Sequence, residues 1–189
     1  METSGRKLFE ASTKKLKEAL CDCDSDGLQD FLKVLNDHAK QFGWLTNATG
    51  ILKTPVDVTH LNQGHTNLIE ECGTVEMERI TACENAHRNL HDRRAQDTHM
   101  LHLCLRASLS DIGRAKVDVC VDEFHVGDEP SGPMLLKVII RESHTDDDAT
   151  TNLIRTELSS LDECIHTIGN DVIKLNNHVK VLVEKLHAR

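Results

Sequence analysis

Tyrosine is absent from this chain of 189 residues, and aromatic residues make up only 3% of it. Proteins that bind single-stranded nucleic acids stack bases on aromatic side chains, so this scarcity argues against that role. Basic residues are the minority, with 22 Lys and Arg against 31 Asp and Glu, and a net charge of −9 disfavours a broad face for phosphate backbones. The chain also has no run of about 18 apolar residues, which argues against a membrane-spanning helix.

Several motifs of catalysis and metal binding are missing too. The chain contains no CxxC pair, no HExxH, no GxSxG, no Walker A loop and no GxGxxG. The seven cysteines are odd in number and scattered, and the amphipathic N-terminus lacks the apolar block of a secretory signal. We therefore expect reduced thiols, a cytoplasmic location, no cofactor, no small-molecule substrate and no enzymatic activity.

What the chain does have is helical periodicity. In residues 27–42 the apolar side chains fall on one helix face, and Gly43 is suited to end that helix. The nearly continuous apolar segment 134–140 predicts a helix that is buried on most sides. We expect an all-α protein of about eight or nine helices. Besides these two, the predicted helices cover residues 6–20, 60–72, 75–90, 94–109 and 111–117, and two C-terminal segments separated by Gly169.

Local signals refine these boundaries. Short polar side chains that can cap a helix stand at several predicted helix starts: Asp24 or Ser25, Thr74, Ser110, Ser131 and Asn170. The acidic triplet 146–148 predicts a break between two helices, because acidic residues favour a helix N-terminus. Segment 117–130 alternates apolar and polar residues, which predicts an extended loop or a marginal hairpin.

The stretch CDCDSDGLQD, residues 21–30, resembles the first half of an EF-hand loop. Asp22, Asp24 and Asp26 fill its first ligand positions, but Lys33 stands where the bidentate glutamate belongs. The favoured interpretation is an acidic turn that caps the following helix. The alternative is a calcium- or metal-binding helical interaction module that uses Asp22, Asp24, Asp26 and Asp30.

Histidines provide a third, weaker hypothesis. Glu84 and His87 form an ExxH motif, and His91 lies one helical turn beyond His87. Di-iron helical bundles use two such motifs, and here there is one, so the favoured interpretation is polar helix surface. The same applies to a second group formed by His99, His102 and Cys104.

Three segments of the chain carry a resemblance to a known family: GLQDFLKVLNDHAKQFGW, RRAQDTHMLHLCLRASLSDIGRAKV and SGPMLLKVIIRESHTDDDATTNLIRTELSSLDECIHTIGNDVIKLNNHVKVLVEKLHAR. They resemble the Gag polyprotein of copia-type LTR retrotransposons. The resemblance covers about residues 24–189 and implies a retroviral capsid-like fold. It also implies a structural, self-associating capsid protein of such an element, or of a domesticated copy, that forms capsid-like assemblies.

The same resemblance implies a division of the chain. Residues 1–23 would form an N-terminal helix and acidic turn, 24–146 an N-terminal capsid-like domain, and 147–189 the start of a C-terminal capsid-like domain. The family's zinc knuckle does not occur in the sequence, so RNA of the element would be bound only indirectly, through a region absent here.

The expected partner is a second copy of the chain. The two C-terminal helices have one-sided apolar faces, and small helical proteins often bury such a surplus against a partner. The predicted oligomer interface comprises Leu158, Leu161, Gly169, Val179, Leu182 and Leu186.

Overall fold

The computed structural model describes residues 2–17, 20–46, 50–55, 65–71, 74–88, 92–159, 161 and 171–187. Helices dominate these residues, which confirms the all-α class, while the capsid-like arrangement stays a prediction. The described α-helices are α1 (Glu2–Ser12), α2 (Ser25–Phe42), α3 (Met77–His87), α4 (Asp92–Ser108), α5 (Asp111–Asp118), α6 (Gly132–Ser159) and α8 (Val172–His187). The shorter elements are the 3₁₀ helix η1 (Val121–Phe124) and the strands β1 (Lys53–Pro55), β2 (His65–Asn67), β3 (His125–Val126) and β4 (Glu129–Pro130).

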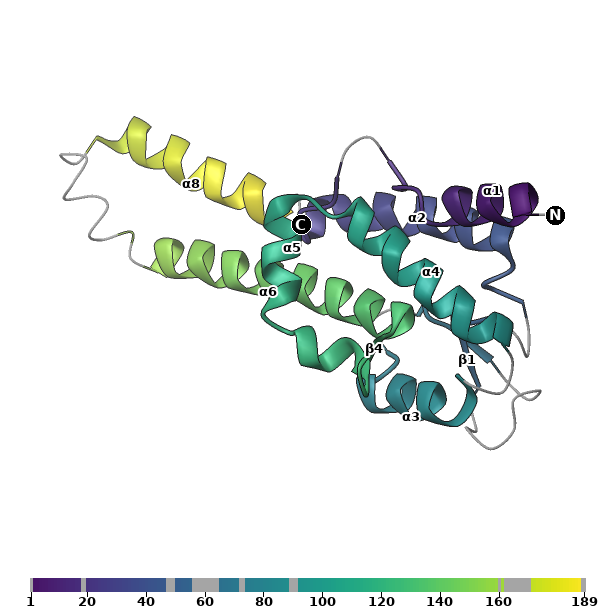
Figure 1. Cartoon of the computed structure of the whole chain (residues 1–189). Coiled ribbons are helices and arrows are strands. Elements are labelled where there is room, and N and C mark those ends of the chain that lie inside the picture. Colours follow the sequence, from purple (N-terminus) through teal and green to yellow (C-terminus); the bar gives the residue numbers. More distant parts are fainter. Residues whose placement is uncertain are drawn as a thin grey trace.

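Helix α6 is the central element, and α2, α3, α4, α5 and η1 all pack against it (Figure 1). Six side chains of its N-terminal half are at most 3% exposed: Met134, Leu135, Leu136, Val138, Ile139 and Ile140. Successive helical positions point in different directions, so such a run is buried only when neighbours cover most sides of the helix. The predicted burial is therefore confirmed, and each of these side chains stabilises the fold by about 1.5–3 kcal/mol.

Helix α2 follows its local sequence signals closely. The Asp24 side chain caps the helix by accepting a hydrogen bond of 3.0 Å from the Gly27 N–H. Gly43 ends it with a left-handed φ of 76°, a conformation that favours glycine. The predicted apolar face is buried: Leu28, Phe31, Leu32, Leu35 and Ala39.

The other capping predictions have mixed outcomes. Ser110 caps α5 by accepting from the Gly113 N–H, and Ser131 accepts from the Met134 N–H at the start of α6. Thr74 caps nothing: its hydroxyl donates to the Glu71 carbonyl, and α3 begins only at Met77.

Two predicted helices are wrong in part, because tertiary contacts supply other partners for the backbone. α1 ends at Ser12 rather than Leu20, and the Cys21 backbone instead bonds to the α4–α5 junction through Ser108 and Ser110. In place of a helix over 60–72, residues 65–67 form β2 and pair antiparallel with β1. Residues 68–71 form a turn rather than a helix, and residues 60–64 and 72 lie outside the described residues.

The predicted break at 146–148 is also wrong, since α6 continues without interruption from Gly132 to Ser159. Acidic side chains lower helix propensity only slightly, and neither glycine nor proline stands in this part of the helix. The boundary proposed between residues 146 and 147 therefore falls inside a helix, and the division into domains stays a prediction. The extended loop or marginal hairpin predicted over 117–130 is confirmed only for residues 125–130, which form the short β3–β4 pair. Residues 117–118 instead end α5, and residues 121–124 form η1.

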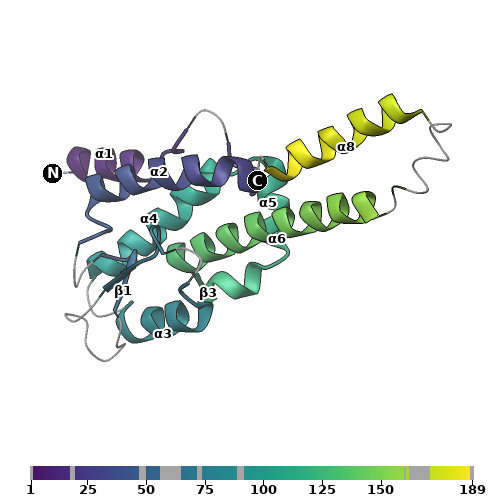
Figure 2. The same cartoon turned by 180° about the vertical axis from the view of Figure 1, so that it is seen from behind.

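The C-terminal half of α6 extends beyond the other helices, and α8 returns beside it (Figures 1 and 2). Asp171 caps α8, accepting from the backbone N–H groups of Ile173 and Lys174 at 3.0 and 3.2 Å. The predicted cap, Asn170, lies outside the described residues. We call residues 144–159, 161 and 171–187 the C-terminal arm. Within the described ranges, no helix combines the length and apolar character needed to cross a membrane.

Candidate functional site

The C-terminal arm differs from the core in how deeply its apolar side chains are buried. Four apolar side chains of the arm are only half-buried: Leu158, Leu161, Leu175 and Val179. Two more are largely exposed, Val172 at 75% and Ile173 at 74%. Across the described side chains of the arm, no large apolar residue reaches the burial of the α6 core. The arm therefore presents apolar surface to solvent on α8 and near the C-terminal end of α6.

The predicted interface residues are only partly described. Leu158, Leu161 and Val179 lie on the arm and are half-buried. Leu182 and Leu186 belong to α8, but their side chains lie outside the described part, and Gly169 lies outside it altogether.

The sequence prediction missed Val172 and Leu175 as interface candidates. A signal for them exists: positions 172, 175, 179, 182 and 186 are all apolar and alternate in steps of three and four. This heptad spacing is typical of a helix that packs along its whole length against other helices.

Charge also distinguishes the two helices of the arm. The α6 segment from Glu142 to Glu157 contains five acidic residues against Arg155 alone. α8 contains Lys174, Lys180 and Lys185 against a single acidic residue, Glu184. Opposite charges favour α6 and α8 as neighbours, within one chain or between two chains.

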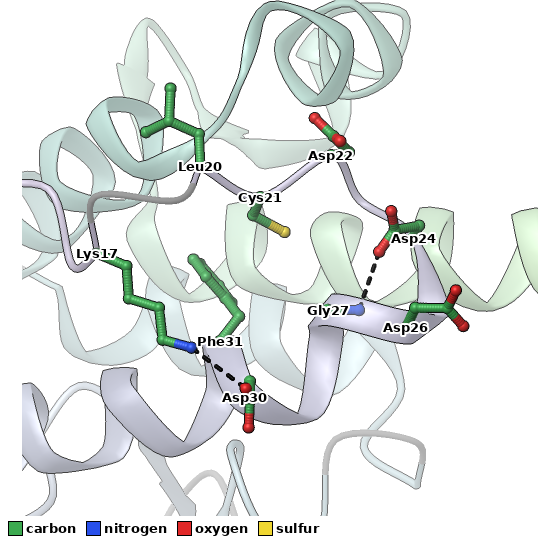
Figure 3. Close-up of a pocket in the computed structure, with 9 residues that line it drawn as sticks. All are labelled: Lys17, Leu20, Cys21, Asp22, Asp24, Asp26, Gly27, Asp30 and Phe31. Atoms are coloured by element: carbon green, nitrogen blue, oxygen red, sulfur yellow. Dashed lines mark hydrogen bonds and ion pairs between the residues drawn. The ribbon is translucent and has the colours of Figure 1, made fainter.

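A second feature is an acidic pocket of about 380 Å³ at the start of α2 (Figure 3). Its lining consists of Lys17, Leu20, Cys21, Asp22, Asp24, Asp26, Gly27, Asp30 and Phe31. The lining includes all four aspartates of the calcium hypothesis.

Most of these aspartates already have partners within the protein. Asp24 is occupied as the α2 cap, and the Asp30 carboxylate pairs with the Lys17 ammonium at 3.5 Å. Asp22 accepts a hydrogen bond from the Ser110 hydroxyl. Among the residues described, no three Asp, Glu, His or Cys side chains gather in a way that could hold a metal ion. The capping role predicted for Asp24 is confirmed.

Glu84, from the third hypothesis, lies in a buried polar cluster between α3, α4 and the start of α6. Its carboxylate accepts from the Ser131 hydroxyl at 2.9 Å and lies 3.9 Å from the Arg94 guanidinium. Burial raises the pKa of Glu84, although the hydrogen bond and nearby arginines oppose that rise. These contacts give Glu84 a structural role. The His87 side chain and His91 lie outside the described residues.

The remaining candidates, His99, His102 and Cys104, have different surroundings. His99 is exposed, whereas His102 is half-buried with its ring centroid 5.9 Å from that of Phe124. Burial lowers the pKa of His102 to about 4. Cys104 is buried instead beside His38, 3.8 Å from its Nε2 atom.

A scan of the chain against protein-family models finds no match. Searches of curated proteins and of solved structures find none either.

Proposed function

We propose that this protein is a structural, non-enzymatic protein that self-associates through its C-terminal arm. The observation that carries the proposal is the incomplete burial of the arm: none of its large apolar side chains with a described environment is buried. An exposed apolar surface of this kind marks a site of association. The occupant is a second copy of the chain.

The geometry favours a symmetric pair of arms. Two helices side by side cover only one face of each other, whereas four helices enclose a common core. α8 has 16 residues and is therefore about 24 Å long at about 1.5 Å per residue. The part of α6 from residue 144 to Ser159 is of similar length. Two arms related by a twofold axis would form a four-helix bundle in which every helix is covered along its length.

This role agrees with the resemblance to copia-type Gag, which implies a self-associating capsid protein. We propose that the paired arm is one contact of such an assembly, in the cytoplasm, with RNA of the element bound only indirectly. The acidic net charge of −9 supports the absence of direct RNA binding.

Size-exclusion chromatography with light scattering tests this proposal. The wild-type protein should elute at twice the 21.2 kDa of one chain, or above. Replacing Val172 and Ile173 together by lysine places two charges in the proposed interface. Because both side chains are about three-quarters exposed in the single chain, the fold should persist while the oligomer dissociates.

Val119 provides a matched control. It is apolar and 85% exposed, and it is the C-cap residue of α5, outside the residues of the arm. Val119→Lys should leave the oligomer intact. A wild-type protein that stays monomeric at high concentration, or equal dissociation by both variants, would overturn the proposal.

A further inference from the structure

Cys21 and Cys23 form a pair of thiols on either side of Asp22, in the turn that leads into α2. Both are free thiols, and they are 8% and 0% exposed. The Cys21 sulfur points into the acidic pocket (Figure 3). Only Asp22 separates the two residues, and a side-chain interaction with the other thiol is the largest influence on the pKa of each. The Cys23 sulfur also lies 3.8 Å from the Gly113 carbonyl oxygen. Cys21 thus lines a pocket, whereas Cys23, two residues further along the chain, is fully buried.

Tertiary contacts hold this pair in place. The Cys21 backbone accepts from Ser110 N–H and donates to the Ser108 carbonyl. The Lys116 ammonium donates to the Cys23 carbonyl at 2.9 Å. Cys23 has a positive φ of 53°, the one such non-glycine residue in the described part of the chain. Residues held in this conformation cost of order 1–3 kcal/mol and cluster at functional sites.

A neighbouring thiol also lowers the pKa of the first thiol of a pair to ionise. The hydrogen bond from Cys23 lowers the pKa of Cys21 to about 7, although burial and nearby carboxylates oppose the effect. The same bond raises the pKa of Cys23, because a second charge beside the first is unfavourable. Cys21 is therefore the nucleophile of the pair: it lines the pocket, whereas Cys23 is fully buried, and a thiolate is the reactive form.

We propose that Cys21 and Cys23 are a redox-active dithiol, which a small neutral hydroperoxide oxidises to an intramolecular disulfide. The Cys21 thiolate attacks one peroxide oxygen, the O–O bond breaks, and Cys21 becomes a sulfenic acid. The oxygen that leaves takes up a proton. The Cys23 sulfur then attacks the Cys21 sulfur, the S–O bond breaks, and that oxygen leaves as water with the Cys23 proton. In total, two thiols are oxidised and hydrogen peroxide is reduced to two waters.

The charge of the pocket selects the oxidant. Four aspartates line it, and its one cation, Lys17, is paired with Asp30. Anionic reagents such as glutathione disulfide are repelled from this surface, whereas uncharged hydrogen peroxide is not. The thiols should therefore react faster with a neutral aromatic disulfide than with an anionic one.

Peptide mapping of the wild-type protein tests the proposal directly. Protein treated with hydrogen peroxide is blocked with N-ethylmaleimide, unfolded and cut with a protease that cleaves before aspartate, which separates Cys21 from Cys23 at Asp22. We expect the two fragments to remain joined by a disulfide and to carry no maleimide. Maleimide on both cysteines, or disulfides formed with other cysteines instead, would overturn the proposal.

Variants separate the two roles, with Cys120 as the control. Cys23→Ser should trap the Cys21 sulfenic acid, detected as a dimedone adduct, whereas Cys21→Ser should abolish the fast reaction. Cys120 is half-buried outside the pocket, and burial and nearby carboxylates raise its pKa, so Cys120→Ser should change nothing. In the wild type we expect Cys21 to react at least about tenfold faster than Cys120, because of its greater thiolate fraction. Equal rates would contradict the assignment, whatever the oligomeric state.

Discussion

Gly132, the first residue of α6, lies where this helix presses on α4. A Cβ atom at this position would lie 2.7 Å from both Cβ and Cγ of Leu101 and 2.8 Å from the Thr98 carbonyl oxygen. These contacts are shorter than a real Cβ atom tolerates, and one of them is to backbone, so Gly132→Ala must push the two helices apart. The contact bears on the proposed self-association because α6 continues from here into the C-terminal arm.

Two opposing effects set the size of the change. Overpacking of this kind typically costs about 1–3 kcal/mol. Alanine in place of glycine favours the folded helix by about 0.5–1 kcal/mol. From the midpoints of these two ranges we expect Gly132→Ala to lower the free energy of unfolding by about 1 kcal/mol.

Urea denaturation measures this difference, as a lower midpoint with an unchanged slope. Gly5→Ala in the exposed helix α1 is the matched control, because nothing lies within 4 Å of its added Cβ. That variant should be as stable as the wild type or slightly more stable. If Gly132→Ala is as stable as Gly5→Ala, the close approach of α4 and α6 is refuted.

Three further predictions concern buried or capping side chains. Asp24→Ala removes the α2 cap and should lower the free energy of unfolding by about 0.5–2 kcal/mol, while millimolar calcium should leave the wild-type melting temperature unchanged. Glu84→Ala leaves Arg94 buried without its carboxylate and should cost about 3–5 kcal/mol in urea denaturation. Glu84→Gln also removes the charge that faces Arg94, but it should cost less, because its amide oxygen still accepts from Ser131. Burial holds the pKa of His102 at about 4, below the unfolded value of 6.5, so the unfolded chain binds more protons between these values. The stability that neutral His102 contributes above pH 6.5 should be lost as the pH falls to about 4, and His102→Gln should flatten this part of the stability curve.

Local rules explain which parts of the fold could be predicted. The Asp24 cap, the Gly43 terminator and the Ser110 cap each depend on residues a few positions away, so the sequence pattern was sufficient. The run 134–140 also predicted its own burial, because no solvated helix carries apolar residues on all sides. The acidic triplet 146–148 was misread because a preference for helix starts is weaker than the continuity of a helix without glycine or proline.

The candidate sites depended more on long-range contacts. Periodicity identified Leu158, Leu161 and Val179 as one-sided apolar positions, and the structure adds that they are only half-buried. The pair Cys21 and Cys23 carried no recognised motif. Its conformation depends on partners from α4 and α5, about 90 residues further along the chain.

The sequence by itself therefore determined the helical class, the main caps and the buried character of α6, because these follow from neighbours within one or two helical turns. Only the tertiary structure decided that residues 65–67 pair as a strand, that Cys21 bonds to the α4–α5 junction and that the arm extends beyond the core. Those outcomes depend on which distant backbone groups and apolar faces meet, and helical periodicity carries no information about such partners.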